Sequence, residues 1–282
     1  MGSRCSIVIE AETEREAAQA ARLGFDEIAR IEQVLSDYRS DSEAMLLVVG
    51  NPGTWYPVSE CLFEVLTLAW DIHNRTQGAF DPTIGAYTHL WRRSSMPRTL
   101  ELSDARCRVG MDLVELDPMT RTVRFNASGM ILDFGGIGKG YAAQRAVDLI
   151  QASGFPVVQV ELGGDLVLGS PPSTQKTGWS VEIQTGLGDA TVEHLFNCAV
   201  ATSGDLERFY EYNGARYSHI VDPRTGYGIS ERRAVAVIAA DGAIADALAS
   251  AVSVLGLSGV KTIVEEYPEA DIRLVTRGMD EE

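Results

Sequence analysis

The spacing of apolar residues predicts several long helices in this chain. Between Thr13 and Leu35, small and apolar side chains recur every three or four residues, which is the repeat of an amphipathic helix. A similar spacing runs from Val58 to Thr76, where Ser59 is a candidate N-cap. Helices are also expected over Lys139–Ala152, over Ala243–Leu255 and in a last segment that closes at residues 265–268.

Short apolar runs between turn residues predict strands in much of the remaining chain. They occupy residues 5–11, 113–116, 122–125, 157–168 with a glycine break, 179–183, 194–200, 234–240 and 272–276. Residues 92–104 are expected to form a loop, residues 202–205 a turn, and residues 216–227 a polar strand with its exit. Because helices and strands mix without a regular βαβ repeat, the sequence predicts an α+β fold rather than a doubly wound sheet.

Length and charge restrict the kinds of partner that this chain can have. Its 282 residues suffice for one large domain or for two interlocked lobes. The formal net charge of −16 argues against nucleic acid or an anionic membrane as a partner, because phosphates would be repelled. An anionic ligand would therefore need a local positive group or a metal ion.

No segment approaches about 18 uninterrupted apolar residues, so no membrane span is expected. The first four residues, Met1–Arg4, contain no hydrophobic signal region, and a cytoplasmic location is therefore expected. If a signal had been removed from the chain, the location would instead be periplasmic or membrane-anchored.

The cysteines and most of the histidines give no sign of a reactive site. The cysteines are scattered without CxxC or metal-ligand spacing and are expected to be buried or inert thiols: Cys5, Cys61, Cys107 and Cys198. A G-x-S-x-G motif is absent, so a serine hydrolase has little support. His73, His89 and His194 are expected to be structural, whereas His219 lies in a polar stretch with Asp222 and has either a structural or a chemical role.

A glycine-rich loop at residues 131–141 is the strongest candidate for a binding site. A short apolar run ends at Asp133, four glycines follow, and a helix begins near Lys139. Glycines let a ligand approach the backbone closely, and the free N–H groups of a helix N-terminus attract anions. Phosphate or pyrophosphate is the expected ligand, although the spacing matches neither GxxxxGK[ST] nor GxGxxG. The alternative is a plain glycine-rich turn.

A second candidate site lies on the predicted helix Ala243–Leu255. Asp246 and Ser250 are four residues apart and therefore face the same way. A carboxylate and a hydroxyl, with a carbonyl from the glycine loop, are the oxygen ligands that suit Mg²⁺. Such a metal would neutralise pyrophosphate charge beside an acidic protein. Taken alone, Asp246 could equally be a surface carboxylate of the helix.

Two further segments could shape a pocket. Tyr38, in a polar loop, could stack on a planar ligand or only anchor the loop. Gly78–Thr83 ends the second helix with Phe80, Asp81 and a proline, which is typical of a sharp corner or of a binding wall.

Taken together and in this order, these pieces resemble the ApbE family of FAD:protein FMN transferases. The resemblance covers nearly the whole chain and implies a single domain over residues 1–282. This would be an ApbE-like mixed fold of antiparallel sheet and packed helices in two interlocked lobes. It rests on the following segments: residues 35–39, 78–82, 133–142, 163–165, 202–205, 217–226 and 246–250.

The resemblance also implies roles for individual residues. FAD contacts fall at Met1, Tyr38, Ala79, Phe80, Asp81, Asp133, Lys139 and Ile220, and metal ligands at Gly136, through its carbonyl, Asp246 and Ser250. Three residues depart from the family pattern. Gly136 stands where some members carry Ala, Ser250 replaces Thr, and Gln144 stands where members often have Asp.

The activity implied is Mg²⁺-dependent transfer of FMN from FAD, as substrate, to a Ser or Thr hydroxyl of an acceptor protein, with release of AMP. His219 and Asp222 are candidates for the base that activates the hydroxyl. Two alternatives use the same residues. One is a pyrophosphatase that hydrolyses FAD to FMN and AMP, and the other is a protein that binds FAD without turnover.

Overall fold

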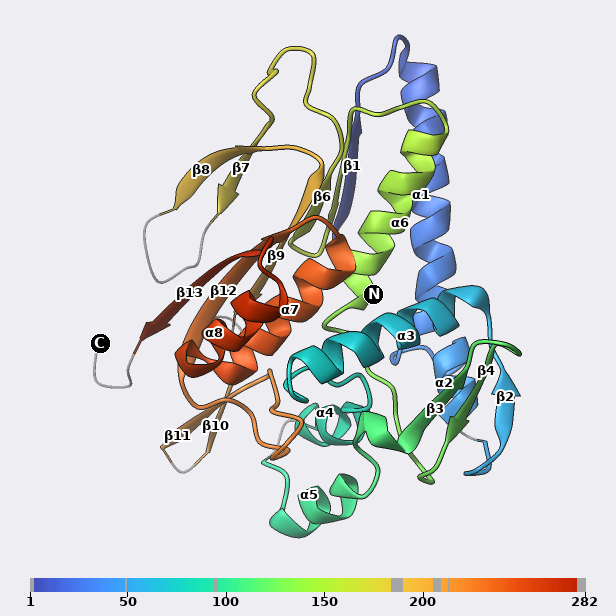
Figure 1. Ribbon diagram of the computed structural model, residues 1–282, viewed down its shortest axis with the longest axis vertical. Coiled ribbons are helices and arrows are strands. Elements are labelled where there is room, and N and C mark those ends of the chain that lie inside the picture. Colours follow the sequence, from blue (N-terminus) through green and yellow to red (C-terminus); the bar gives the residue numbers. More distant parts are fainter. Residues whose placement is uncertain are drawn as a thin grey trace.

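The computed structural model describes residues 3–48, 50–93, 96–183, 190–204, 209–212 and 214–277. It is an α+β fold, as predicted, in which helices pack against antiparallel sheets (Figure 1). The helices are α1 (Glu14–Leu35), α2 (Glu43–Val48), α3 (Glu60–Arg75), α4 (Gly85–Trp91), α5 (Thr99–Arg106), α6 (Gly138–Ala152), α7 (Gly242–Leu255) and α8 (Leu257–Glu266). The strands are β1 (Cys5–Ile9), β2 (Trp55–Pro57), β3 (Val114–Asp117), β4 (Thr122–Phe125), β5 (Val158–Leu162), β6 (Asp165–Leu168), β7 (Trp179–Ile183), β8 (Thr191–Leu195), β9 (Cys198–Gly204), β10 (Phe209–Tyr212), β11 (Ala215–Ser218), β12 (Arg232–Ala239) and β13 (Asp271–Arg277).

The largest sheet has the strand order β1-β5-β6-β9-β12-β13, and every neighbouring pair in it is antiparallel. Successive residues of its inner strands alternate between two hydrophobic cores. In β9, Ala199 and Ala201 belong to the core that contains α6 and α7, whereas Val200 packs with Val181 of the hairpin β7–β8. The helices therefore cover one face of the sheet and the hairpin covers the other.

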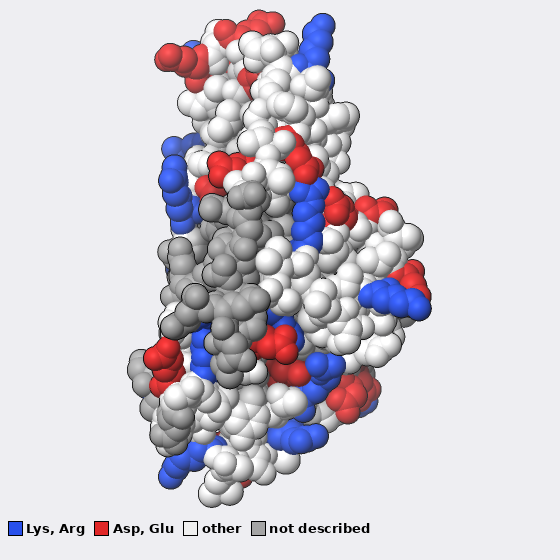
Figure 2. All heavy atoms as spheres, turned by 90° about the vertical axis from the view of Figure 1, so that its left-hand side faces the viewer, with Lys and Arg blue, Asp and Glu red and all other residues white. Residues whose placement is uncertain are grey.

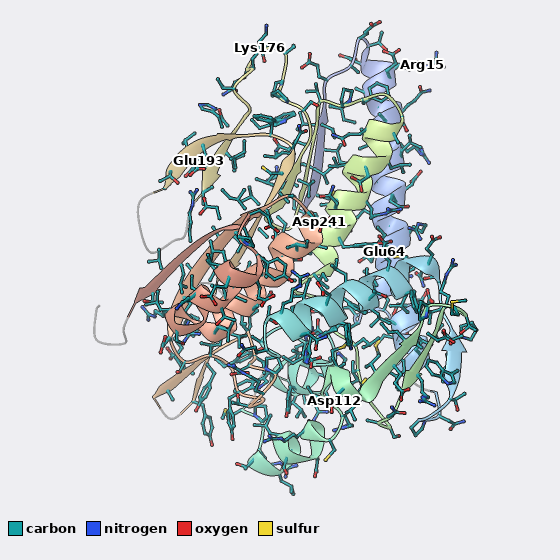
Figure 3. The ribbon with its side chains drawn as sticks, in the orientation of Figure 1. Arg15, Glu64, Asp112, Lys176, Glu193 and Asp241 are labelled. Carbon is teal, nitrogen blue, oxygen red and sulfur yellow. The ribbon has the colours of Figure 1, made fainter. Side chains whose placement is uncertain are left out.

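An ion pair ties that hairpin to the edge of the sheet. Glu193 of β8, labelled in Figure 3, pairs with Arg273 of β13, which also binds Asp271 at 2.6 Å. On the face seen from the left of Figure 1, acidic and basic side chains are interspersed over the described surface rather than separated (Figure 2).

A second part of the molecule contains α2 to α5 and a small sheet of order β2-β4-β3 (Figure 1). One hydrophobic core connects it to the large sheet, because Ile31 of α1, Leu66 of α3 and Ile150 of α6 are fully buried in the same cluster. The two halves therefore share their interior, as interlocked lobes do. A single domain over residues 1–282 stays a prediction.

Both long N-terminal helices begin at a residue whose side chain caps them. Thr13 caps α1 by accepting a hydrogen bond from the Glu16 amide at 3.3 Å, and the Glu16 carboxylate accepts the Thr13 amide in return. Ser59 caps α3 by accepting the Leu62 amide at 3.2 Å, which confirms its predicted role. None of the helices among the described residues has the length and apolar character needed to cross a bilayer.

Three local predictions were wrong. Residues 92–104 are not all loop, because α5 begins at Thr99 and buries Leu102 in a small core around Trp91. Residues 194–200 are not one strand, since β8 ends and β9 begins around Asn197, whose φ of 48° is incompatible with an extended strand. Residues 202–204 continue β9 in register with β12 instead of turning, and residue 205 lies outside the described part.

Candidate functional site

A cleft of about 1100 Å³ lies where α6 and α7 meet the α3–α4 corner and the hairpin β10–β11. Eleven of the residues predicted to bind a ligand or a metal, or to act as the base, line this cleft: Tyr38, Ala79, Phe80, Asp81, Asp133, Gly136, Lys139, His219, Ile220, Asp246 and Ser250. Residues far apart in the sequence therefore converge on one hollow, which is large enough for a drug-sized or cofactor-sized ligand.

Two glycines set the geometry at the floor of the cleft. Helices α6 and α7 cross with Gly140 against Gly242, and a Cβ atom on Gly140 would lie only 1.9 Å from the Gly242 carbonyl oxygen. This close approach brings Asp246 of α7 to the N-terminus of α6, where its Oδ2 accepts the Gly140 amide at 3.1 Å. A carboxylate there is stabilised by the free amides and by the helix dipole.

The ammonium group of Lys139 is held by the same carboxylate. Its Nζ lies 3.1 Å from both oxygens of Asp246, 2.9 Å from Oδ2 of Asp165 and 3.3 Å from the Gly135 carbonyl oxygen. Burial alone would lower the pKa of Lys139, but the charges of Asp246 and Asp165 and their hydrogen bonds raise it above its ordinary value. Lys139 is therefore a fixed positive charge in an acidic protein.

Asp165 was predicted only as part of a glycine motif, and the structure adds it to this cluster. The residue is 2% exposed, and its Oδ2 atom pairs with the ammonium group of Lys139 at 2.9 Å. Burial, then repulsion by Asp246, raises the pKa of Asp165 to about 7, although Lys139 counteracts both effects.

The residues predicted to hold a metal are adjacent. A Cβ atom on Gly136 would lie 2.6 Å from the hydroxyl oxygen of Ser250, so the glycine is packed directly against that side chain. Asp246 lies one helical turn before Ser250 on α7. The set offers oxygen donors only. The positively charged ammonium group of Lys139 also contacts Asp246. These donors fit a hard cation such as Mg²⁺ that retains waters and substrate oxygens.

This site differs from an all-protein metal cage. Among the described residues, no group of three or more His, Cys, Asp or Glu side chains converges as a metal site would. The predicted set contains one carboxylate, one hydroxyl and one carbonyl, so a substrate would have to complete the coordination.

Asp133 anchors the start of the glycine loop. Its Oδ1 accepts the Gly135 amide at 2.9 Å, and its Oδ2 accepts hydrogen bonds from Thr88 at 2.6 Å and from Arg92 at 2.9 Å. Arg92 also pairs with Asp37. Sequence reasoning assigned no role to Thr88, Arg92 or Asp37, because each is an ordinary polar residue until the fold brings α4 beside the loop.

Arg92 also explains where Tyr38 lies. The guanidinium is 4.4 Å from the centre of the Tyr38 ring, and the residue remains 74% exposed. The contact is a cation–π pair that holds one face of the ring against α4. Tyr38 is thus both anchored and open toward the cleft, so the two interpretations of its role are compatible.

The Ala79–Asp81 corner has two functions. Ala79 and Phe80 are 2% and 5% exposed and contribute to the wall of the cleft. Asp81 instead fixes the corner, because its Oδ1 accepts hydrogen bonds from the amide and hydroxyl of Thr83 at 2.8 and 2.6 Å and its Oδ2 accepts the Met111 amide. Burial raises the pKa of Asp81 despite these bonds. Because both of its carboxylate oxygens accept these hydrogen bonds, Asp81 shapes the wall of the cleft.

The candidate bases are not placed alike. His219 is exposed and lines the cleft beside Ile220. Asp222 does not line it, and its carboxylate binds the guanidinium of Arg224 at 2.8 and 2.9 Å. The structure therefore brings His219 to the cleft and leaves Asp222 in an ion pair outside it. Met1 lies outside the described residues.

An aromatic wall that includes Trp91 and Tyr210 borders the cleft. The Trp91 ring lies 5.8 Å from Tyr210 and 5.4 Å from Tyr217, which pair with each other between β10 and β11. The Trp91 indole donates a hydrogen bond to the Gly226 carbonyl at 2.9 Å. Sequence reasoning missed this wall because its members come from separate segments.

Gln144, which departs from the family pattern, retains a polar contact. Its Oε1 accepts the Gly242 amide at 3.0 Å, so it helps to cap α7 together with Asp241. Asp241, close to Glu64 in Figure 3, has its pKa raised by burial and then by nearby carboxylates, including Glu64. The back of the α6–α7 junction is therefore held by hydrogen bonds from several elements.

Comparison with known proteins adds evidence that is independent of this geometry. A protein from Treponema pallidum, named FAD:protein FMN transferase, is 33% identical over 268 residues, which are 88% of this chain and 74% of that protein. One of the same name from Klebsiella pneumoniae is 28% identical over 291 residues, covering 98% and 81%.

Solved structures agree with this result. The ApbE protein of Thermotoga maritima superimposes with a TM-score of 0.87 at 30% identity, covering 98% of this chain and 91% of that one. The flavin transferase ApbE of Vibrio cholerae gives 0.85 at 26% identity, covering 99% and 92%. The model of the ApbE family matches residues 1–274, and this chain therefore belongs to the ApbE family.

Proposed function

We propose that this protein is an FAD:protein FMN transferase, which takes FMN from FAD and attaches it to an acceptor protein. The observation that carries the proposal is the α6–α7 junction, where Lys139, Asp246 and Ser250 meet at the floor of a cleft of about 1100 Å³. Relatives over most of the chain bear the name of this activity. The proposed refinements are Mg²⁺ as cofactor and a Ser or Thr hydroxyl as acceptor.

The residues of the cleft suit a molecule with a planar ring and a pyrophosphate. Lys139 is the positive group that an anionic ligand needs in a chain of net charge −16. The open ring of Tyr38 and the side chain of Phe80 offer surfaces for an aromatic system. Asp133 holds the loop through the Gly135 amide, so that loop is ordered before the ligand arrives.

Gly136, Asp246 and Ser250 would hold Mg²⁺ in this site. When bound, the ion would neutralise charge on the pyrophosphate and stabilise the departing AMP. Such phosphoryl transfers depend on positioning and on charge more than on covalent participation by the enzyme.

The proposed transfer balances without a further reactant. The acceptor hydroxyl oxygen forms a bond to the phosphorus of the FMN half. The bond between that phosphorus and the bridging oxygen breaks, and AMP leaves with the electron pair. We propose His219 as the base that takes the hydroxyl proton, which its exposed position in the lining of the cleft supports.

The experiment that tests the function is incubation of the protein with FAD and Mg²⁺, with and without an acceptor protein that offers a Ser or Thr, followed by separation of the products. The proposal expects AMP to form together with flavin that stays bound to denatured acceptor. Free FMN and AMP, formed equally in both samples, would identify a pyrophosphatase instead. FAD left unchanged under all conditions would indicate a flavin-binding protein.

A further inference from the structure

The carboxylate of Asp165 has no role in the site as described so far. Its side chain is 3% exposed and does not line the cleft, whereas the side chain of Lys139 is 25% exposed and does. The carboxylate therefore lies behind the ammonium group, on the side of the protein interior. We infer that Asp165 is a positioning residue that holds Lys139 at the floor of the cleft for a ligand pyrophosphate. This inference rests on the proposed function.

The turn that presents Asp165 is built for this contact. Strands β5 and β6 form a hairpin in which Leu162 pairs with Asp165 across two glycines. Gly163 and Gly164 have φ values of +61° and +97°, which side chains rarely adopt. A Cβ atom on Gly163 would lie 3.2 Å from Cδ of Lys139. Glycine is thus required both for the turn and for the passage of the lysine side chain.

The geometry around the ammonium group indicates which contact a ligand would replace. An ammonium group has three N–H donors, and here it approaches Asp165 at 2.9 Å, Asp246 at 3.1 Å and the Gly135 carbonyl at 3.3 Å. The carbonyl is the longest contact and the only one without charge. A phosphate oxygen can take its place while both carboxylates keep the lysine where it is.

Asp246 by itself cannot hold the ammonium group of Lys139 if its carboxylate also binds a cation. Its two oxygens already accept Lys139 and the Gly140 amide, and the proposed Mg²⁺ would compete for them. Asp165 contacts the same ammonium group without contributing to that ligand set. Asp165 therefore holds Lys139 whether or not Asp246 is committed to a cation, so its effect can be measured without metal.

The test is equilibrium binding of FAD, ADP and riboflavin in EDTA, so that neither metal nor turnover contributes, at about pH 8, where Asp165 is ionised. The variant is Asp165→Asn, which keeps the shape and removes the charge. We expect it to weaken FAD and ADP binding by about tenfold, because the lysine is no longer held toward the pyrophosphate. Riboflavin, which has no phosphate, should bind as it does to the wild type, within about twofold.

The direction of the change in ligand affinity distinguishes a positioning role of Asp165 from a purely electrostatic effect of its charge. Removing a negative charge near an anionic ligand should tighten its binding, whereas loss of positioning should weaken it. Glu161→Gln is the matched control, because Glu161 accepts the Gly164 amide of the same hairpin at 3.0 Å without contacting Lys139. That control should bind all three ligands like the wild type.

Lys139→Met shows whether Asp165 acts through the lysine. This variant should weaken FAD binding, and adding Asp165→Asn to it should cause no further weakening. If Asp165→Asn alone left FAD and ADP binding unchanged or tighter, the inference would be wrong. The same holds if riboflavin binding were lost too, since Asp165 would then support the fold of the cleft. Wild-type protein that bound no FAD would overturn the proposed function together with the inference.

Discussion

Gly140→Ala tests whether α6 and α7 cross as closely as the site requires. The new Cβ would lie 1.9 Å from the Gly242 carbonyl oxygen and 2.9 Å from Cβ of Asp246. Gly138→Ala is a control on the same helix, because its Cβ would meet Phe134 at 3.5 Å, an ordinary contact. Neither glycine has a positive φ, so the two substitutions differ in the space that each meets.

The size of the effect follows from the distances. To restore the 3.0 Å lower limit of real Cβ contacts, the helices must separate by about 1.1 Å, from 1.9 Å. That movement would break the 3.1 Å hydrogen bond from the Gly140 amide to Asp246. Overpacking costs about 1–3 kcal/mol and a bond to a charged group about 1.5–3, while alanine regains about 1 in helix propensity. Gly140→Ala should therefore lose about 1.5–5 kcal/mol of unfolding free energy.

Urea unfolding, followed by circular dichroism, measures this loss directly. Gly138→Ala should keep the wild-type stability or gain up to about 1 kcal/mol, since only helix propensity changes. A Gly140→Ala protein as stable as Gly138→Ala would refute the close helix crossing. It would also remove the reason for placing Asp246 on the N-terminus of α6.

Three further predictions concern the site itself. Asp246→Ala should abolish turnover of FAD while part of the FAD affinity remains, and full activity of this variant, or of wild type without Mg²⁺, would refute the metal assignment. Tyr38→Ala should weaken flavin binding by about threefold to tenfold, as expected for loss of an exposed ring contact, and an unchanged FAD dissociation constant would restrict Tyr38 to anchoring its loop. Burial raises the pKa of Asp165 from 3.8 to about 7. Between these two pH values, the folded protein therefore binds a proton that the unfolded chain does not bind. Wild type should therefore lose stability relative to Asp165→Asn as pH rises from about 4 to about 7 in urea titrations, and parallel pH profiles would contradict this pKa.

The sequence was most informative where a feature is local. Helix periodicity predicted α1 and α3, and Ser59 was predicted as the cap of α3, because this information lies within a few consecutive residues. It was least informative for short elements stabilised by distant contacts. Helix α5 has a weak pattern of its own and is held by burial of Leu102 and Ala105 against the Trp91 core.

For the site, the motifs predicted which residues would meet but not how they interact. Asp81 precedes a proline and Asp133 lies two residues before a glycine, yet one fixes a corner and the other anchors the glycine loop. Asp165 could not be assigned a role, since only the hairpin turn and the position of Lys139 reveal its partner. Residues that are brought into contact only by folding show no characteristic spacing in the sequence.

The most direct test of the central claim is intact-mass spectrometry of an acceptor protein after incubation with this enzyme, FAD and Mg²⁺. The account predicts that the acceptor gains the mass of one FMN group, that replacing its acceptor Ser or Thr by Ala prevents the gain, and that Asp246→Ala enzyme does not produce it. An unmodified acceptor in the presence of wild-type enzyme that consumes FAD would contradict the transferase function and leave a pyrophosphatase.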